Sequence, residues 1–173
     1  GSADPGLTAA LSGDVVAPTM TQQQDAFVLV DRFPAATLTW VDLKTAQVRT
    51  QLNVGTGFAA NPQDYLHIGD SKGYVSRYER NPLAGQQPYD EGDDVLVIDP
   101  STASIKARIG LEALREDGVL ARPGRMVQSG KMAYVLLGMY SDDFMKTSEA
   151  KLVEIDTTTD EVRQTVKLAG LHG

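Results

Sequence analysis

An all-β fold built from three repeated units is predicted by a register that recurs every 57 residues. The apolar segment 38–42 returns at 95–99 and at 152–156, and each copy ends in an aspartate, at Asp42, Asp99 and Asp156. An alternating segment follows each copy in the same register, with Leu52, Ile109 and Val166 at one of its positions. An apolar strand, a polar turn and an alternating strand form one hairpin, copied three times. Strand repeats of this length indicate a radial or stacked β architecture.

Each unit is predicted to contain four antiparallel strands in up-and-down order. The second strands begin with an aromatic residue, at 27–30, 74–77 and 134–137. The first strands are expected at 65–68 and 125–128, with a weaker counterpart near 15–21. The third strands are almost wholly apolar, as in strands covered on both faces, and the fourth strands alternate, as in strands with one solvated face.

The expected divisions are an arm with a tag remnant at 1–14, units at 15–56, 57–112 and 113–169, and a tail at 170–173. Together the three units form one structural domain, and 111–120 has room for one or two helical turns. The side chains expected to be buried are Val41, Val97, Val153, Ile98, Ile155, Leu52, Ile109 and Val166. Those expected to be exposed are Lys44, Lys106 and Arg163.

The repeated unit resembles the blade of the YVTN-type β-propellers, the YncE-like group. The resemblance lies in an aromatic-Val strand, a Val-Ile-Asp strand end, a threonine three residues later and an alternating strand. The sequence Asn61-Pro62-Gln63-Asp64, with Tyr74-Val75-Ser76-Arg77-Tyr78 after it, is similar to bacterial envelope proteins and lipoproteins of that group. The resemblance covers roughly 25–170. It implies a β-propeller in the bacterial cell envelope or outside the cell, with the leader absent, and leaves the activity open.

Three units are too few to close a propeller ring. Propellers have 4–8 blades, so three units form a partial propeller, about half of a larger ring. We expect the chain either to form an oligomer or to be a fragment completed by further blades, because exposed sheet edges invite pairing. A β-trefoil is the alternative that explains three units, although the Gln-x-Trp signature typical of it is missing.

Composition argues against several classes of partner. The net charge is −7 with an isoelectric point near 4.7, and no cluster of Lys and Arg stands out. Nucleic acid and anionic membrane surfaces are therefore not expected as partners. No apolar run is long enough to be a transmembrane segment. The absence of cysteine excludes disulfides, thiolate zinc sites and cysteine nucleophiles.

The candidate binding residues belong to loops that should open on one face of the blades. Connections between units and between second and third strands vary in length, and variable loops on a constant frame are typical of binding surfaces. Their polar residues could contact a ligand, and converging arginines could clamp a carboxylate or phosphate. The alternative is that Asp64 caps backbone amides, and that the arginines pair with Asp31, Glu79 and Asp64. The predicted set is Asn61, Gln63, Asp64, Arg32, Arg80, Arg125 and Tyr140, with Arg122 nearby.

The acidic run and the histidine of the inner strand are further candidates for chemistry. The acidic run 89–94 contains Asp90, Asp93 and Asp94, which could ligate calcium, although it lacks the spacing of an EF-hand loop. His67 lies on an innermost strand and could act as a base or be a packed residue. The aspartates that end the third strands are predicted to cap turns, because a catalytic residue is rarely copied into every unit. Trp40 is expected in inter-unit packing or at an exposed edge.

The leading functional prediction is a non-catalytic envelope or secreted propeller that binds a protein, a glycan or a small ligand on its loop face. No Gly-rich phosphate loop, Ser-His-Asp pattern or helix-borne His-Glu motif is present. No cofactor is expected, with calcium the one ion considered. One alternative is a propeller lyase or hydrolase that uses Asp64, His67 and an arginine at the channel mouth. The other is a half-propeller whose role is to assemble.

Overall fold

The computed structural model describes residues 10–20 and 25–172, and its strands form three four-stranded antiparallel sheets. The predicted tag remnant at Gly1-Ser2 and the last residue of the tail lie outside the described residues. The helical turn expected within 111–120 is a short 3-10 helix, η1 (Glu112–Leu114). No helix within the described ranges is long and apolar enough to cross a membrane.

Each predicted unit contains one sheet, called here a blade. Blade 1 consists of β1 (Val15–Val16), β2 (Ala26–Asp31), β3 (Thr37–Asp42) and β4 (Val48–Asn53). Blade 2 consists of β5 (Pro62–Gly69), β6 (Lys72–Arg80), β7 (Gly92–Asp99) and β8 (Ser104–Gly110). Blade 3 consists of β9 (Pro123–Ser129), β10 (Met132–Leu137), β11 (Glu149–Asp156) and β12 (Glu161–His172). Within each blade the strands pair in chain order.

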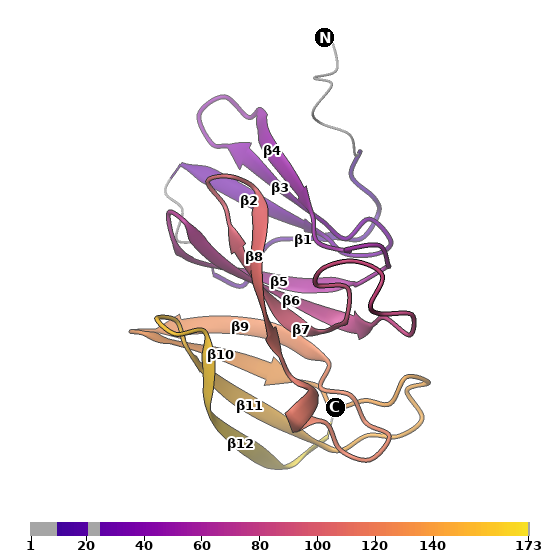
Figure 1. The fold of residues 1–173 in the computed structure, drawn as a ribbon. Helices are drawn as coiled ribbons and strands as arrows, with labels where there is room; N and C mark the ends of the chain where they lie inside the picture. Colours follow the sequence, from indigo (N-terminus) through magenta and orange to yellow (C-terminus); the bar gives the residue numbers. More distant parts are fainter. Residues whose placement is uncertain (1–9, 21–24, 173) are drawn as a thin grey trace.

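The blades follow one another through the molecule in chain order (Figure 1). Their first strands are innermost: β5 contacts β9, and Met20 of the segment after β1 forms a parallel bridge with Leu66 of β5. This is an arc of three propeller blades. One rim of the arc, the loop face, carries the connections between blades and between second and third strands. The other rim, the turn face, carries the short hairpin turns.

The third and fourth strands of every blade share the same irregularity. The pairing register shifts between Trp40 and Val41 in blade 1, and at the same position, 57 and 114 residues later, in blades 2 and 3. One extra residue in the fourth strand accounts for each shift, as in a β-bulge. The extra residues are cationic and contact the aspartate that ends the third strand, in the pairs Arg49–Asp42, Lys106–Asp99 and Arg163–Asp156.

These aspartates have the turn-capping role that the sequence predicted. Asp42 accepts hydrogen bonds from the backbone amides of Lys44 and Thr45 at 2.8 and 2.9 Å, and the other two aspartates cap their turns in the same way. Each turn then places one residue in the left-handed region, with φ of 56° at Ala46, 47° at Ala103 and 60° at Asp160. The hydrogen bond from the Arg49 side chain and the turn amides lower the pKa of Asp42.

Two apolar clusters hold neighbouring blades together. The cluster between blades 1 and 2 includes Leu38 and Trp40 packed with Val75 and Ile98. The cluster between blades 2 and 3 joins a second set of blade 2 residues to blade 3, with Tyr74, Val95, Ile109, Val135, Val153 and Ile155 among its members. A fully buried aliphatic side chain contributes about 1.5–3 kcal/mol. Blade 2 therefore carries apolar side chains on both faces and forms the centre of the core.

Most of the predicted core is confirmed, and two details are wrong. Val166 was expected to be buried but is 44% exposed, because no blade covers its face of β12. Val41 and Leu52, also expected to be buried, are half-buried. The aromatic alignment of the second strands is also wrong in blade 1. Val28 lies opposite Trp40, just as Tyr74 lies opposite Val97, so Phe27 is one residue out of register and points to the other face of the sheet.

Candidate functional site

The structure brings together five of the predicted loop-face residues, contributed by all three blades. Arg32 of blade 1 donates from Nη1 to Gln63 Oε1 at 3.2 Å, and Arg125 of blade 3 donates from Nη1 to the Gln63 carbonyl at 3.1 Å. Gln63 in turn donates from Nε2 to Asn61 Oδ1 at 2.8 Å. The convergence follows from the propeller arc, which places the starts of the inner strands next to one another.

Asp64 lies at the centre of this group and is fully buried. Its carboxylate accepts hydrogen bonds from the backbone amides of Thr19, Tyr65 and Met126, at 2.9, 3.0 and 2.9 Å. These three amides belong to the inner segments of blades 1, 2 and 3. Asp64 therefore joins the three blades at their centre. The sequence suggested that Asp64 caps backbone amides, and in the structure these amides come from all three blades.

Among the partners expected for the loop-face arginines, Asp64 is confirmed and Asp31 is not. Arg32 binds Asp14, with Nε to Oδ1 at 2.9 Å, in place of Asp31. Arg125 approaches Asp64 at 3.9 Å, as expected. All of these interactions are made with other groups of the same chain, so the cluster is a hydrogen-bonded framework on the loop face.

Arg80 and Tyr140 belong to a separate group on the outer part of the loop face. Arg80 pairs with Asp142, and Glu79 pairs with Arg122, as the sequence allowed for these arginines. The Tyr140 ring contacts that of Phe144 with centroids 5.8 Å apart. Arg122 lies beneath them, fully buried, with its guanidinium 4.8 Å from the centre of the Phe144 ring. The sequence pointed to this arginine but missed its position inside an aromatic cluster.

The carboxylates of the acidic run have different partners. Asp90 accepts the backbone amides of residues 85–87, and Asp93 accepts the amides of Ala121 and Arg122. Asp94 forms a fully buried ion pair with Arg77, whose Nη2 is 2.7 Å away. Among the described residues no group of three or more His, Asp or Glu side chains could hold a metal ion. The structure therefore does not assemble the calcium ligand set considered from the sequence.

His67 is buried on β5, with its Nδ1 3.0 Å from the Tyr65 hydroxyl. Burial lowers the pKa of His67, and the nearby carboxylates of Asp70 and Asp25 act in the opposite direction. Asp64 is three residues away along the same strand, a separation of about 10 Å at 3.3 Å per residue. Asp64 and His67, two of the groups in the catalytic alternative, therefore do not lie side by side.

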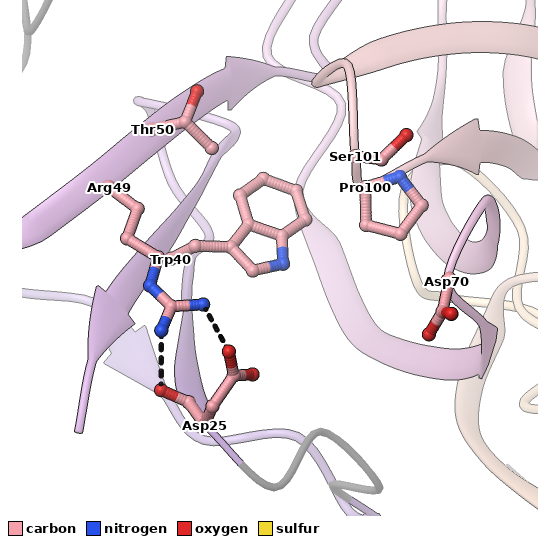
Figure 2. Close-up of a pocket in the computed structure, with 7 residues that line it drawn as sticks. All are labelled: Asp25, Trp40, Arg49, Thr50, Asp70, Pro100 and Ser101. Atoms are coloured by element: carbon pink, nitrogen blue, oxygen red, sulfur yellow. Dashed lines mark hydrogen bonds and ion pairs between the residues drawn. The ribbon is translucent and has the colours of Figure 1, made fainter. Parts of the chain in front are cut away.

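A pocket of about 400 Å³ lies between blades 1 and 2 on the turn face, opposite the predicted loop face (Figure 2). The β5–β6 and β7–β8 turns supply Asp70 and Ser101 on one side, and blade 1 supplies the other side. The complete lining consists of Asp25, Trp40, Arg49, Thr50, Asp70, Pro100 and Ser101. This site was not predicted from the sequence, although the single tryptophan, at a position occupied by Val97 and Glu154 in the other units, was a signal.

Trp40 is the least satisfied polar residue of the pocket. It is 2% exposed, and its indole Nε1–H makes no hydrogen bond within the described part of the chain. The Tyr65 ring meets the indole edge-on with centroids 5.8 Å apart. Burial raises the pKa of the Tyr65 hydroxyl, and the Trp40 side chain lowers it to a smaller extent. Figure 2 shows the indole nitrogen on the side of the pocket where Pro100 and Asp70 lie.

The carboxylates that line the pocket have oxygen atoms available to accept hydrogen bonds from a ligand. The Arg49 guanidinium is occupied, because it donates to the Asp25 carboxylate at 2.9 Å and to Asp42 at 2.6 Å. Asp70 is exposed and has no hydrogen-bond partner among residues 10–20 and 25–172. The pocket therefore combines one buried donor with carboxylate oxygens on opposite blades.

Comparisons with known proteins bear on the fold. No protein-family model and no curated protein matches this chain. Among solved structures it is similar to dihydro-heme d1 dehydrogenase NirN in complex with DHE, with a TM-score of 0.53 and 13% sequence identity. The similarity covers 90% of this chain and 28% of the NirN chain. It supports the three-blade partial propeller, and the chain spans less than a third of that propeller-like protein.

Proposed function

We propose that this chain is a non-catalytic, ligand-binding segment of a β-propeller whose ligand is a small neutral sugar held in the pocket between blades 1 and 2. The observation that carries the proposal is the buried Trp40 Nε1–H, which has no hydrogen-bond partner among the described residues and belongs to a pocket that the carboxylates of Asp25 and Asp70 also line. An unsatisfied buried donor costs about 1–3 kcal/mol. A ligand oxygen that accepts from this donor would recover that cost.

The charge of the pocket favours hydroxyl groups over anions. Asp25 and Asp70 contribute two negative charges, and the single positive charge of Arg49 is already shared with Asp25 and Asp42. A phosphate or carboxylate ligand would be repelled, whereas a sugar hydroxyl can donate to a carboxylate and accept from an indole N–H. Pro100 adds an apolar surface for the C–H groups of a sugar ring.

Binding is favoured over catalysis by the arrangement of the candidate catalytic groups. Asp64 is saturated by three backbone amides, and His67 lies toward the other end of β5 with its ring against Tyr65. The proposal also places the module in the bacterial envelope or outside the cell, on the resemblance to envelope propellers. It locates the ligand on the turn face, whereas the sequence analysis favoured the loop face.

Tryptophan fluorescence tests the proposal directly, because Trp40 is the only tryptophan of the chain. The protein is titrated with glucose, N-acetylglucosamine, maltose and cellobiose at millimolar concentrations. We expect at least one sugar to give a saturable change in the Trp40 emission. Asp70→Asn should weaken that binding by about tenfold, the effect of losing roughly 1.4 kcal/mol.

The matched control is Asp117→Asn, which removes one exposed carboxylate far from the pocket lining. Its titration should match that of the unmodified protein. No response to any of the four sugars, or equal binding by the Asp70→Asn variant, would contradict the proposal. A response to ethanolamine in place of the sugars would assign the pocket to a cationic amine and also overturn the sugar class.

A further inference from the structure

Blade 3 leaves an apolar sheet face without a neighbour. This surface, called here the blade 3 end face, consists of Val127, Tyr134, Leu136, Leu152 and Val166. They are connected across the strands: Val127 lies opposite Tyr134, Leu136 opposite Leu152, and Leu152 opposite Val166. Leu136 is 42% exposed, although it lies at the centre of a four-stranded sheet. Glu154 lies opposite Tyr134 on the same face, and the row formed by Leu136, Leu152 and Val166 is apolar.

The same positions form the interfaces inside the arc. Val95 and Ile109, each 57 residues before Leu152 and Val166, are buried in the cluster between blades 2 and 3. Leu38, a further 57 residues back, is buried in the cluster between blades 1 and 2. The blade 3 end face is therefore the third copy of a surface that binds a neighbouring blade in both earlier cases.

The 57-residue repeat also defines the surface that the blade 3 end face should bind. Blade 2 receives blade 1 through Val75 and Ile98, and blade 3 receives blade 2 through Val135 and Ile155. The equivalent residues of blade 1, by strand register, are Leu29 and Val41. With Phe27 and Val48, which lie on the same side of the sheet, they form the blade 1 end face, where Phe27 is 36% exposed.

We propose that the blade 3 end face binds the blade 1 end face of a second copy of this chain. Two such contacts would join two arcs of three blades into a closed six-bladed ring, within the range of 4–8 blades that propellers adopt. This contact would continue the two interfaces already present, and the blade 1 end face is the one receiving surface of the described chain that no blade covers. The proposed contact involves the ends of the arc and does not depend on the sugar pocket.

Light scattering coupled to size exclusion tests this inference, with one copy weighing 18.6 kDa. We expect twice that mass at micromolar concentrations. Leu136→Asp on the blade 3 end face and Phe27→Asp on the blade 1 end face should each give a monomer. Val127→Lys is a second variant of the first surface if Leu136→Asp does not fold, and circular dichroism checks folding in each case. The control is Met145→Asp, at a loop residue that is 85% exposed and outside both end faces.

Mixing the variants gives the decisive result. Leu136→Asp retains an intact blade 1 end face and Phe27→Asp an intact blade 3 end face, so an equimolar mixture should restore a two-copy complex through one unmodified contact. A monomeric unmodified chain at every concentration would overturn the inference and assign both end faces to blades of another polypeptide. A dimer that resists both variants, or an open series of more than two copies, would overturn it as well.

Discussion

Single residues show how similar sequence signals lead to different roles. Asp64 and His67 are two polar residues on the same inner strand, and both were candidates for chemistry. Asp64 caps one amide from each blade, whereas His67 is packed against Tyr65. The difference depends on which neighbouring strand each side chain meets, because alternate residues of a strand point to opposite faces.

His67 should make stability depend on pH. Burial lowers its pKa, so the folded protein binds fewer protons at this site than the unfolded chain. The corresponding stability is present above the unfolded pKa of about 6.5 and is lost as the pH falls through that value toward the folded pKa. We therefore expect the free energy of unfolding to fall from pH 7 to pH 5 more in the unmodified protein than in His67→Gln.

Urea denaturation of both proteins at the two pH values measures this difference. His172 is present in both proteins and its contribution cancels in the comparison. An equal pH dependence of the two proteins would show that His67 has the same proton affinity in the folded and unfolded states.

At the scale of the element, the repeated hairpin contains a strained position that the sequence does not reveal. Ala46 and Ala103 have left-handed φ angles, which cost an L-residue other than glycine roughly 1–2 kcal/mol. We expect Ala46→Gly and Ala103→Gly each to raise the free energy of unfolding by about 1 kcal/mol, less the entropy that glycine gains in the unfolded chain. Thermal or urea denaturation of the single variants provides the measurement.

Ala107→Gly is the matched control, because Ala107 lies within β8 and has no left-handed φ. It should lower the free energy of unfolding by roughly 0.5–1 kcal/mol. If the two turn variants lose stability to the same extent as this control, the turns do not hold the left-handed conformation in solution.

At the scale of the whole molecule, burial distinguishes the inside of the arc from its ends. Ile98 and Ile155 are fully buried in the two inter-blade clusters, whereas Val166 lies on the blade 3 end face. We expect Ile98→Ala and Ile155→Ala each to lower the free energy of unfolding by about 2–5 kcal/mol. Val166→Ala should cost less than about 1 kcal/mol, as is usual for exposed positions.

Chemical denaturation at a protein concentration where the chain is a monomer allows the three variants to be compared. A large loss for Val166→Ala under those conditions would mean that the end face is covered within a single chain. A loss below about 1 kcal/mol in both isoleucine variants would mean that the inter-blade clusters contribute little.

The sequence predicted the fold through its periodicity. The 57-residue register located the third and fourth strands of every blade, and the recurring aspartates predicted the turns. It also indicated that Arg32, Gln63 and Arg125 would meet on one face. These features are repeated or local, and hydrogen-bonded turns and alternating strands depend mainly on residues close together in the chain.

The tertiary structure determines the burial and the partners of the residues that come together from different blades. It showed that Phe27 is one residue out of register, that Val166 lies on an uncovered face, and that the acidic run divides among separate partners. It also placed the pocket around Trp40 on the face opposite the predicted one. The physical reason is that burial and polar satisfaction depend on which sheet packs against which. Those contacts join residues far apart in the chain, whereas the repeat describes each blade alone.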